Sequence, residues 1–213
     1  MEGSRNGLEL YLDTQQQHEY TQNVLSNGAL ILLHDRHDHP DMLSFAIHTV
    51  PGESAFIALK LKKSVNLPAP YGNCGERKLA YYKKYSKVNC RAECLHNMTL
   101  KTCGCRMVYY PEVKGYRDCS PRDIITCYFP LSENTTQIKR QCDCIVPCEI
   151  LSFDYSISSS KMSAKPISLE FNRTAESVEK DFVSVALYYT DMTYEEVVQQ
   201  EAYSTLTLFA DIG

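Results

Sequence analysis

The sequence predicts an α+β fold in which a cysteine-rich helical segment lies between two segments of β-strands. Short apolar runs and apolar–polar alternation occur within residues 7–71 and again within 149–213, as expected of strands. Apolar and aromatic residues recur at three- and four-residue steps between Tyr81 and Leu95, which is the period of a helix. All ten cysteines of the 213 residues lie between Cys74 and Cys148.

The first segment contains three predicted strands, at 28–33, 43–47 and 56–61. Pro51-Gly52 is a turn signal between the second and the third. Residues 67–71 read Leu-Pro-Ala-Pro-Tyr, and proline restricts both itself and its predecessor to extended backbone. We therefore expect a stiff, extended exit from this segment.

The middle segment contains one predicted helix, over 86–102. Cys90 and Cys94 are four residues apart, so a helix places both thiols on one face, one turn apart. Cys142 and Cys144 are two apart and share one face of an extended strand. A helix face can therefore be linked to a neighbouring strand.

The last segment begins with alternation at 150–155, which predicts a strand. Residues 163–181 are predicted to be helical, and the strong alternation of 182–188 predicts another strand. Residues 194–203 fit either a strand or a helix.

The cysteines indicate the compartment. An even, dense set in one segment is typical of a disulfide framework in an oxidising environment. Sequons at Asn97, Asn134 and Asn172 are also typical of a lumenal or extracellular chain. Zinc binding is the alternative, because Cys-x-Cys and Cys-x3-Cys clusters can hold metal. Zinc sites usually combine four ligands, often with histidine, in a reducing compartment, so we expect disulfides and no metal.

Charge and missing motifs exclude other classes. Lys+Arg 22 against Asp+Glu 26 leaves no clustered basic face for nucleic acid. We find no hydrolase, metalloprotease or phosphate-loop motif, so we expect neither an enzyme nor a cofactor. The sequence has no signal peptide and no run of 18 apolar residues. Because an exported chain needs one or the other, we expect a fragment of a longer protein.

The ordered motifs resemble the degenerin/epithelial sodium channel family, in its acid-sensing-like or peptide-gated branch. The resemblance runs from Gly7 to Gly213. The residues that carry it are Gly7-Leu8-Glu9-Leu10, Val50-Pro51-Gly52, Leu67 to Cys74, Cys90-x3-Cys94, Cys103-Gly-Cys105-Arg-Met107, Cys142-Asp-Cys144-Ile-Val-Pro147-Cys148, Ala202-Tyr203 and Asp211-Ile212-Gly213.

The resemblance implies a hand-like extracellular domain. Residues 1–72 would be palm and β-ball strands with a short finger loop, and 73–149 a disulfide-rich helical thumb. Residues 150–213 would hold the knuckle helices, near 161–182, and the last palm strands, which lead toward a second transmembrane helix. The parent would be a homo- or hetero-trimeric, amiloride-sensitive-type sodium channel in the plasma membrane, with Na⁺ as permeant ion and a peptide or proton as ligand.

The resemblance also implies one disulfide pairing out of the many that ten cysteines permit. The pairs would form a nested ladder that makes the thumb a rigid lever: Cys74–Cys148, Cys90–Cys144, Cys94–Cys142, Cys103–Cys127 and Cys105–Cys119.

Several positions match the family's gating residues. Tyr71 matches the aromatic that packs at the thumb–membrane wrist, and Met192-Thr193 match a two-residue linker that moves in desensitisation. Glu195 and Glu196 match lower-palm carboxylates, whose proximity and burial would make them proton-sensitive. Asp211 matches the acidic residue above the pore, where it can attract cations or bind Ca²⁺. The alternative is an ordinary turn at Tyr71 and at Met192-Thr193, and a solvated carboxylate pair at Glu195 and Glu196.

Two departures favour a peptide over protons as ligand. The finger loop spans only 21–27 and has no acidic residue, and one of two facing thumb carboxylates is replaced by Phe129, which leaves Glu133. His34, His37 and His39 form a candidate pH or Zn²⁺ site, with a solvated loop as the alternative. A secreted, disulfide-rich binding or adhesion module remains the alternative function.

Overall fold

The computed structural model describes residues 2–16, 27–134, 138, 141–202 and 209–210. The chain divides into two compact units. Unit 1 comprises residues 1–35, 40–63 and 151–197, and unit 2 comprises 36–39, 64–150 and 198–213. Each unit therefore combines stretches that are far apart in the sequence.

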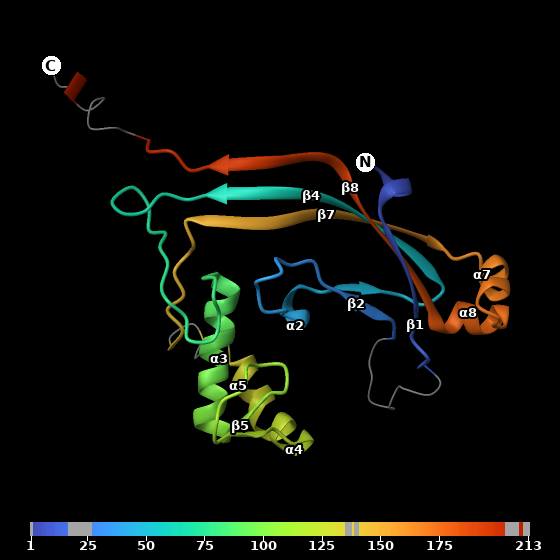
Figure 1. Cartoon of the computed structure of the whole chain (residues 1–213), viewed down its shortest axis with the longest axis horizontal. Helices are drawn as coiled ribbons and strands as arrows, with labels where there is room; N and C mark the ends of the chain where they lie inside the picture. Colours follow the sequence, from blue (N-terminus) through green and yellow to red (C-terminus); the bar gives the residue numbers. More distant parts are fainter. Residues whose placement is uncertain (1, 17–26, 135–137, 139–140, 203–208, 211–213) are drawn as a thin grey trace. The chain divides into compact units, whose positions relative to one another are not determined.

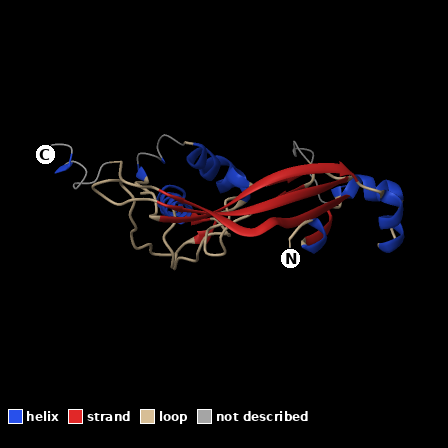
Figure 2. Ribbon diagram, turned by 90° about the horizontal axis from the view of Figure 1, so that it is seen from above, coloured by secondary structure: helices blue, strands red, loops and turns tan. Residues whose placement is uncertain are grey.

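Unit 1 is built on a four-stranded sheet of order β1-β8-β4-β7 (Figures 1 and 2). β1 runs antiparallel to β8, with Leu10 opposite Val185 and Leu12 opposite Val183. β2 and β3 form a separate two-stranded antiparallel sheet. The strands are β1 (Leu8–Asp13), β2 (Ala29–Ile31), β3 (Ile47–Thr49), β4 (Glu53–Val65), β7 (Glu149–Lys161) and β8 (Phe182–Val198), and a 3-10 turn, η1 (Ser4–Asn6), precedes β1.

The core of this sheet follows from alternation along two strands. Ile57 and Leu59 on β4 are two residues apart and share a face with Val183 and Val185 of β8. Ile47 of β3 closes the cluster, and all five side chains are buried. Burying a side chain of this size stabilises the fold by roughly 1.5–3 kcal/mol.

The predicted helical segment 163–181 is two helices, α7 (Ala164–Glu170) and α8 (Ala175–Asp181). Asn172 breaks the helix with a φ of 51°, and the Thr174 side chain caps α8 by accepting from the Ser177 amide. The helices lie at one end of the sheet, between β7 and β8 (Figure 1). Met162, Ala164, Val178 and Phe182 form their core.

The predicted strand at 43–47 is wrong over most of its length. Met42–Phe45 form a short helix, α2, and β3 begins only at Ile47. The Asp41 carboxylate accepts from the Ser44 amide, a helix cap that outweighs the local alternation. The ambiguous segment at 194–203 is strand as far as Val198, because β8 continues through it.

Unit 2 is organised around α3 (Lys87–Cys103), which confirms the predicted helix. The Ser86 side chain caps its start, and Gly104, with a φ of 65°, ends it in the left-handed conformation. Two short parallel strands follow, β5 (Cys105–Arg106) and β6 (Arg117–Asp118). A helical stretch that the sequence did not predict runs from α4 (Pro121–Asp123) through the π-helical turn η2 (Ile124–Tyr128) to α5 (Phe129–Glu133).

Among the described residues of unit 2, buried side chains form two small cores. One surrounds Cys105, Met107, Tyr110 and Tyr128, and the other comprises Leu79, Tyr85 and Cys90.

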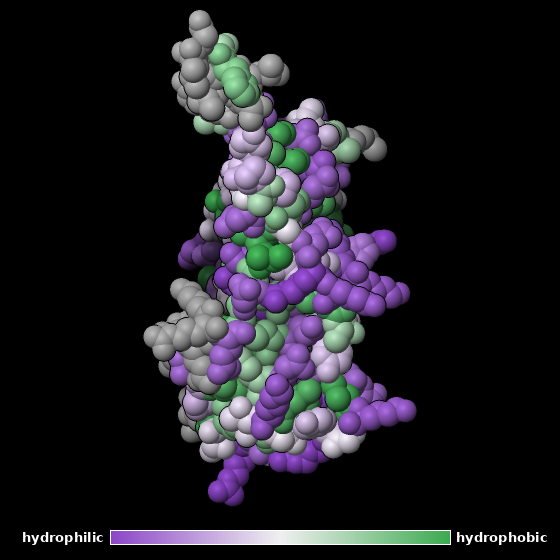
Figure 3. All heavy atoms as spheres, turned by 90° about the vertical axis from the view of Figure 1, so that its left-hand side faces the viewer, coloured by the Kyte–Doolittle hydropathy of each residue, from purple (hydrophilic) through white to green (hydrophobic). Residues whose placement is uncertain are grey.

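On the face shown in Figure 3, hydrophobic residues form small areas between projecting hydrophilic side chains. The predicted α+β class is confirmed. In the part of the chain that the structure describes, no helix is long and apolar enough to cross a membrane.

Candidate functional site

Five disulfides staple unit 2, and their pairs are those that the resemblance implied. Two of them join one face of α3 to the segment that follows α5. The strand expected at Cys142 and Cys144 is not formed, because the Cys144 amide donates to the Cys142 carbonyl in a tight turn. Their Cα atoms are 4.9 to 5.9 Å apart, a usual range for the bond. The pairs are Cys74–Cys148, Cys90–Cys144, Cys94–Cys142, Cys103–Cys127 and Cys105–Cys119.

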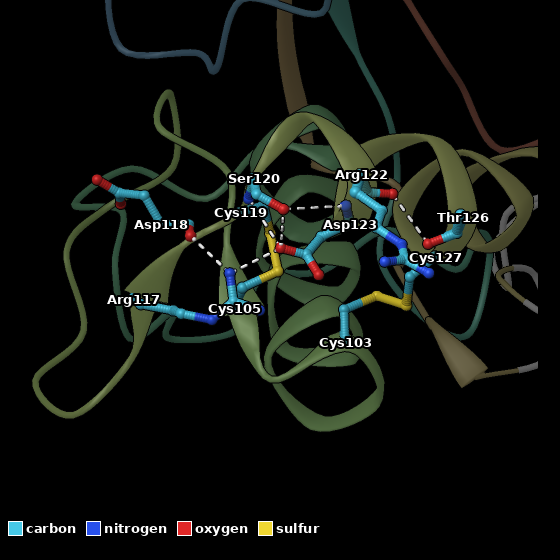
Figure 4. Close-up of polar contacts among 10 residues, drawn as sticks. All are labelled: Cys103, Cys105, Arg117, Asp118, Cys119, Ser120, Arg122, Asp123, Thr126 and Cys127. Atoms are coloured by element: carbon cyan, nitrogen blue, oxygen red, sulfur yellow. Dashed lines mark hydrogen bonds and ion pairs between the residues drawn. A yellow bond between two sulfur atoms is a disulfide. The ribbon is translucent and has the colours of Figure 1, made fainter.

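The end of α3 is held by two of these bonds and by a capping network (Figure 4). Ser120 and Asp123 cap α4 reciprocally, the amide of each bonding the side chain of the other. Arg117 donates to the same Asp123 oxygen at 2.7 Å. These contacts, first of all the Arg117 hydrogen bond, hold the pKa of Asp123 well below its usual range.

Tyr71 lies in unit 2, and 48% of its surface is exposed. Its neighbour is Glu201, which follows β8 by three residues. The Glu201 charge, and then its hydrogen bond to the phenol, raise the pKa of Tyr71. The side chain thus links the start of the stapled region to the chain that follows the longest strand of unit 1.

The sequence suggested that Met192 and Thr193 form a linker between two elements. Both residues instead lie inside β8. Met192 is 67% exposed. Thr193 donates both its amide and its hydroxyl to the Asp191 carboxylate, and these bonds lower the pKa of Asp191. The pair is therefore a local hydrogen-bonded feature of a continuous strand.

Glu195 and Glu196 each lie beside a lysine of β4. Lys60 Nζ is 3.6 Å from the Glu195 carboxylate, and Lys63 Nζ is 3.3 Å from that of Glu196. All four side chains are partly exposed, so each pair contributes little to stability. Within this chain each of the two carboxylates has a cationic partner on β4.

Other predicted positions are separate from these. Asp211 and residues 21–26 of the finger loop lie outside the described residues. Glu133 is exposed at the end of α5. Of the sequon asparagines, Asn134 and Asn172 are exposed and Asn97 is half-buried on α3.

The three candidate histidines make three different contacts. His34 Nδ1 lies 2.8 Å from the Asp35 carbonyl, and His37 Nε2 accepts from Arg36 at 3.2 Å. His39 stacks on the ring of Tyr110. Among the residues that the structure describes, no group of three His, Cys, Asp or Glu side chains could hold a metal ion.

The sequence did not predict two features, the ion pairs of β4 in unit 1 and the buried polar residues of α3 in unit 2. The lysines of β4 carried no signal for their glutamate partners, which lie more than 130 residues away. Asn89 and His96 are polar residues on buried positions of α3, and both are fully buried. Their place in the apolar period of 86–102 was the available signal, because a polar residue at such a position needs partners in the fold.

The chain is similar to known ion-channel proteins over its whole length. A sequence profile described as amiloride-sensitive sodium channel matches residues 1–213. Acid-sensing ion channel 2 of Danio rerio is 28% identical over 224 residues, which cover 99% of this chain and 42% of that protein. Acid-sensing ion channel 1 of Gallus gallus is 27% identical over 99% of the chain and 42% of its own length. The chain thus spans less than half the length of these curated relatives.

Proposed function

Because the chain belongs to the amiloride-sensitive sodium channel family, we propose that it is an extracellular portion of a ligand-gated sodium channel subunit in the plasma membrane. The observation that carries the proposal is the match of the family profile to the whole chain. The family is one of ion channels and not of enzymes. The subunit would assemble as a trimer with identical or related subunits.

The proposed mechanism uses unit 2 as a rigid body. Five disulfides between Cys74 and Cys148 resist internal deformation, so a force on one part of the unit displaces all of it. Tyr71 and its Glu201 contact would transmit that displacement toward the pore. Met192, Thr193, Glu195 and Glu196 on β8, together with Asp211, would respond to it. Ligand binding would then shift the population between closed and open states.

We favour an extracellular peptide as the ligand, because the finger loop has no carboxylate and the thumb keeps only Glu133 of two acidic positions. Protons are the second candidate. The relatives are named as acid-sensing channels, which favours protons.

The test is current from oocytes that express the full-length subunit encoded with this chain. We expect amiloride-sensitive sodium current on addition of an activating neuropeptide at pH 7.4, and little sustained current at pH 5 without peptide. A large proton-evoked current with no peptide response would assign protons as the ligand. Absence of sodium current under all conditions, with the protein shown at the cell surface, would contradict a homomeric channel, and co-expression with related subunits tests the heteromer.

The wrist contact is tested in the same recordings. Tyr71→Ala removes the ring, whereas Tyr71→Phe keeps the ring and removes the hydroxyl that meets Glu201. We expect Tyr71→Ala to reduce the maximal current several-fold, with a smaller effect for Tyr71→Phe. Tyr116→Ala, at another exposed tyrosine of unit 2, is the control. An equal loss of maximal current in Tyr71→Ala and Tyr116→Ala would show that Tyr71 has no specific role in gating.

The secreted binding module is distinguished by the transcript. A second glycine after Gly213 followed by about 20 apolar residues, enough to cross a bilayer, supports the channel. A stop codon there, with no hydrophobic segment upstream, would favour the secreted module.

A further inference from the structure

His96 is a titratable side chain buried inside unit 2. It lies on α3, is 0% exposed, and neither Nδ1 nor Nε2 has a hydrogen-bond partner of good geometry. Most buried polar atoms in proteins are hydrogen-bonded, so a histidine with two unsatisfied ring nitrogens requires an explanation. None of the contacts proposed above for channel gating involves this side chain.

Aromatic rings enclose His96 and continue from it to residues 36–39. Tyr81 meets the His96 ring edge-on, with ring centroids 5.2 Å apart, and Tyr110 stacks on it at 4.9 Å. His39 stacks on Tyr110 at 4.8 Å with only 10° between the planes. Tyr82 lies edge-on to His39, and its hydroxyl is 3.1 Å from His39 Nδ1. The rings thus form a continuous stack from α3 to His39.

Within unit 2, residues 36–39 are held against α3 by this stack and by the buried side-chain amide of Asn89. Asn89 Oδ1 accepts from the His39 amide at 2.7 Å, and Asn89 Nδ2 donates to the His37 carbonyl at 2.9 Å. Both bonds connect the segment to α3, two turns before His96. The seating of 36–39 on α3 therefore depends on Asn89 and on the ring stack.

Electrostatics oppose a proton on His96 in this arrangement. Burial is the main cause that lowers the pKa of His96. The charges of Arg106 on β5 and of His39 lower this pKa further. The Pro111 carbonyl and the Glu93 carboxylate act in the opposite direction. Glu93 Oε2 also accepts from the Tyr81 amide at 2.9 Å. The rings that contact His96 are those of Tyr81 and Tyr110.

We propose that His96 is a buried proton-binding site whose protonation releases residues 36–39 from α3. Neutral His96 is compatible with the closed ring stack. A protonated imidazolium carries two N–H donors, whereas the Pro111 carbonyl supplies one backbone acceptor and the aromatic rings of the stack supply none. The imidazolium also lies near the Arg106 guanidinium. The ring must therefore reach water or a new acceptor, and this movement separates it from Tyr110 and loosens the contact of Tyr110 with His39.

The direction of the pH dependence follows from linkage. The open arrangement binds the proton more readily than the closed one, so lower pH favours opening. The closed arrangement is fully favoured above the ordinary histidine pKa of about 6.5 and loses stability as the pH falls below it. For one proton, the opening equilibrium changes by at most about tenfold per pH unit. Carboxylates with ordinary pKa values titrate below this range.

The test uses the intact 213-residue chain, secreted with all five disulfides, and does not require channel activity. Histidine side-chain NMR between pH 8 and 4.5 gives the pKa of His96 directly. Hydrogen exchange at pH 7.5, 6.0 and 5.0, corrected for the intrinsic rate, gives the protection of residues 36–39 and of 106–110. We expect His96 to titrate below about 6.5 and protection of both segments to fall several-fold between pH 7.5 and 5.0.

The decisive variant is His96→Phe, which keeps an aromatic ring between Tyr81 and Tyr110 but cannot titrate. We expect it to retain protection at pH 5.0, whereas His48→Phe, at an exposed histidine of β3, keeps the wild-type pH dependence. Loss of the pH dependence in His39→Phe but not in His96→Phe would place the proton on His39 and overturn the proposal. Titration of wild-type His96 at or above its ordinary pKa would also overturn the proposal. This measurement remains available if His96→Phe does not fold.

Discussion

At the scale of single residues, a few side chains hold several backbone or side-chain partners at once. Asp123 Oδ2 accepts from Arg117, from the Ser120 amide and from the Ser120 hydroxyl, all between 2.6 and 2.8 Å. Asn89 is fully buried and connects α3 to the His37 carbonyl, the Lys84 carbonyl and the His39 amide. Each of these side chains bonds more than one partner, so its removal breaks several hydrogen bonds at once.

Asp123→Asn tests the capping network. The asparagine is neutral and cannot accept from Arg117 and Ser120 as strongly, so we expect calorimetry at pH 7 to show a melting temperature a few degrees below that of the wild type. A lowered carboxyl pKa stabilises the fold above the unfolded value near 3.8, and this contribution is lost as the pH falls through the folded value. The difference between the proteins should therefore narrow below about pH 3.8. Asp143→Asn, at an exposed aspartate, is the control, and equal effects of the two changes would contradict the assignment.

Asn89→Ala tests the buried amide. It removes the hydrogen bonds of Asn89 to the His39 amide and to the His37 and Lys84 carbonyls, so we expect unit 2 to lose about 1–3 kcal/mol of stability. Hydrogen exchange of α3 and of residues 36–39 measures the loss. Arg91→Ala on the exposed face of the same helix should change stability by less than about 0.5 kcal/mol. If residues 36–39 kept wild-type protection in Asn89→Ala, the amide would not be what fixes them.

At the scale of elements, the turn at Gly52 forms backbone hydrogen bonds to the ends of two strands of unit 1, β7 and β8. Its amide donates to the Phe182 carbonyl at the start of β8, and its carbonyl accepts from the Met162 amide just after β7, both at 2.8 Å. Its φ is 76°, and a Cβ there would lie 2.6 Å from the Glu179 carbonyl oxygen. A side chain is therefore excluded by both conformation and space.

Gly52→Ala is expected to destabilise unit 1 by about 3 kcal/mol, at the upper end of the range for a strained residue, because steric overlap adds to the strain. Gly104→Ala is the comparison, since Gly104 also has positive φ but no atom within 4 Å of the added Cβ. Its expected effect on unit 2 is about 1 kcal/mol. Hydrogen exchange in increasing urea measures both. Equal losses would show that the Glu179 contact has no effect.

At the scale of the whole molecule, the covalent cross-links belong to one unit only. All ten cysteines lie in unit 2, and unit 1 is stabilised by its sheet and its apolar clusters. A disulfide typically contributes about 2–4 kcal/mol, so unit 2 depends on an oxidising environment far more than unit 1 does.

Reduction should therefore affect the two units differently. After treatment with dithiothreitol and alkylation, we expect α3 to lose its protection against hydrogen exchange, whereas β4 and β8 keep most of theirs. Mass spectrometry of peptides from each unit measures both effects, and a chain alkylated without reduction is the control. Complete loss of protection in both units would show that unit 1 cannot fold without the disulfides.

Much of the local structure was readable from the sequence. The period of 86–102 predicted α3, and alternation predicted the strand that begins at Phe182. The order of the cysteines, through the resemblance, implied the five observed pairs. Prediction failed at 43–47, where the Asp41 cap outweighs alternation, and at 121–133, where the helical stretch is divided into short turns with no clear apolar period.

The sequence by itself determined the fold class, the family and the division between a stapled segment and its strand-rich flanks. These follow from spacing along the chain, which periodicity and cysteine order record directly. Only the tertiary structure decided that Lys60 pairs with Glu195 and that His39, Tyr110 and His96 share one stack. Partners more than 10 residues apart are chosen by strand register and by the packing of buried rings, and neither leaves a local pattern in the sequence.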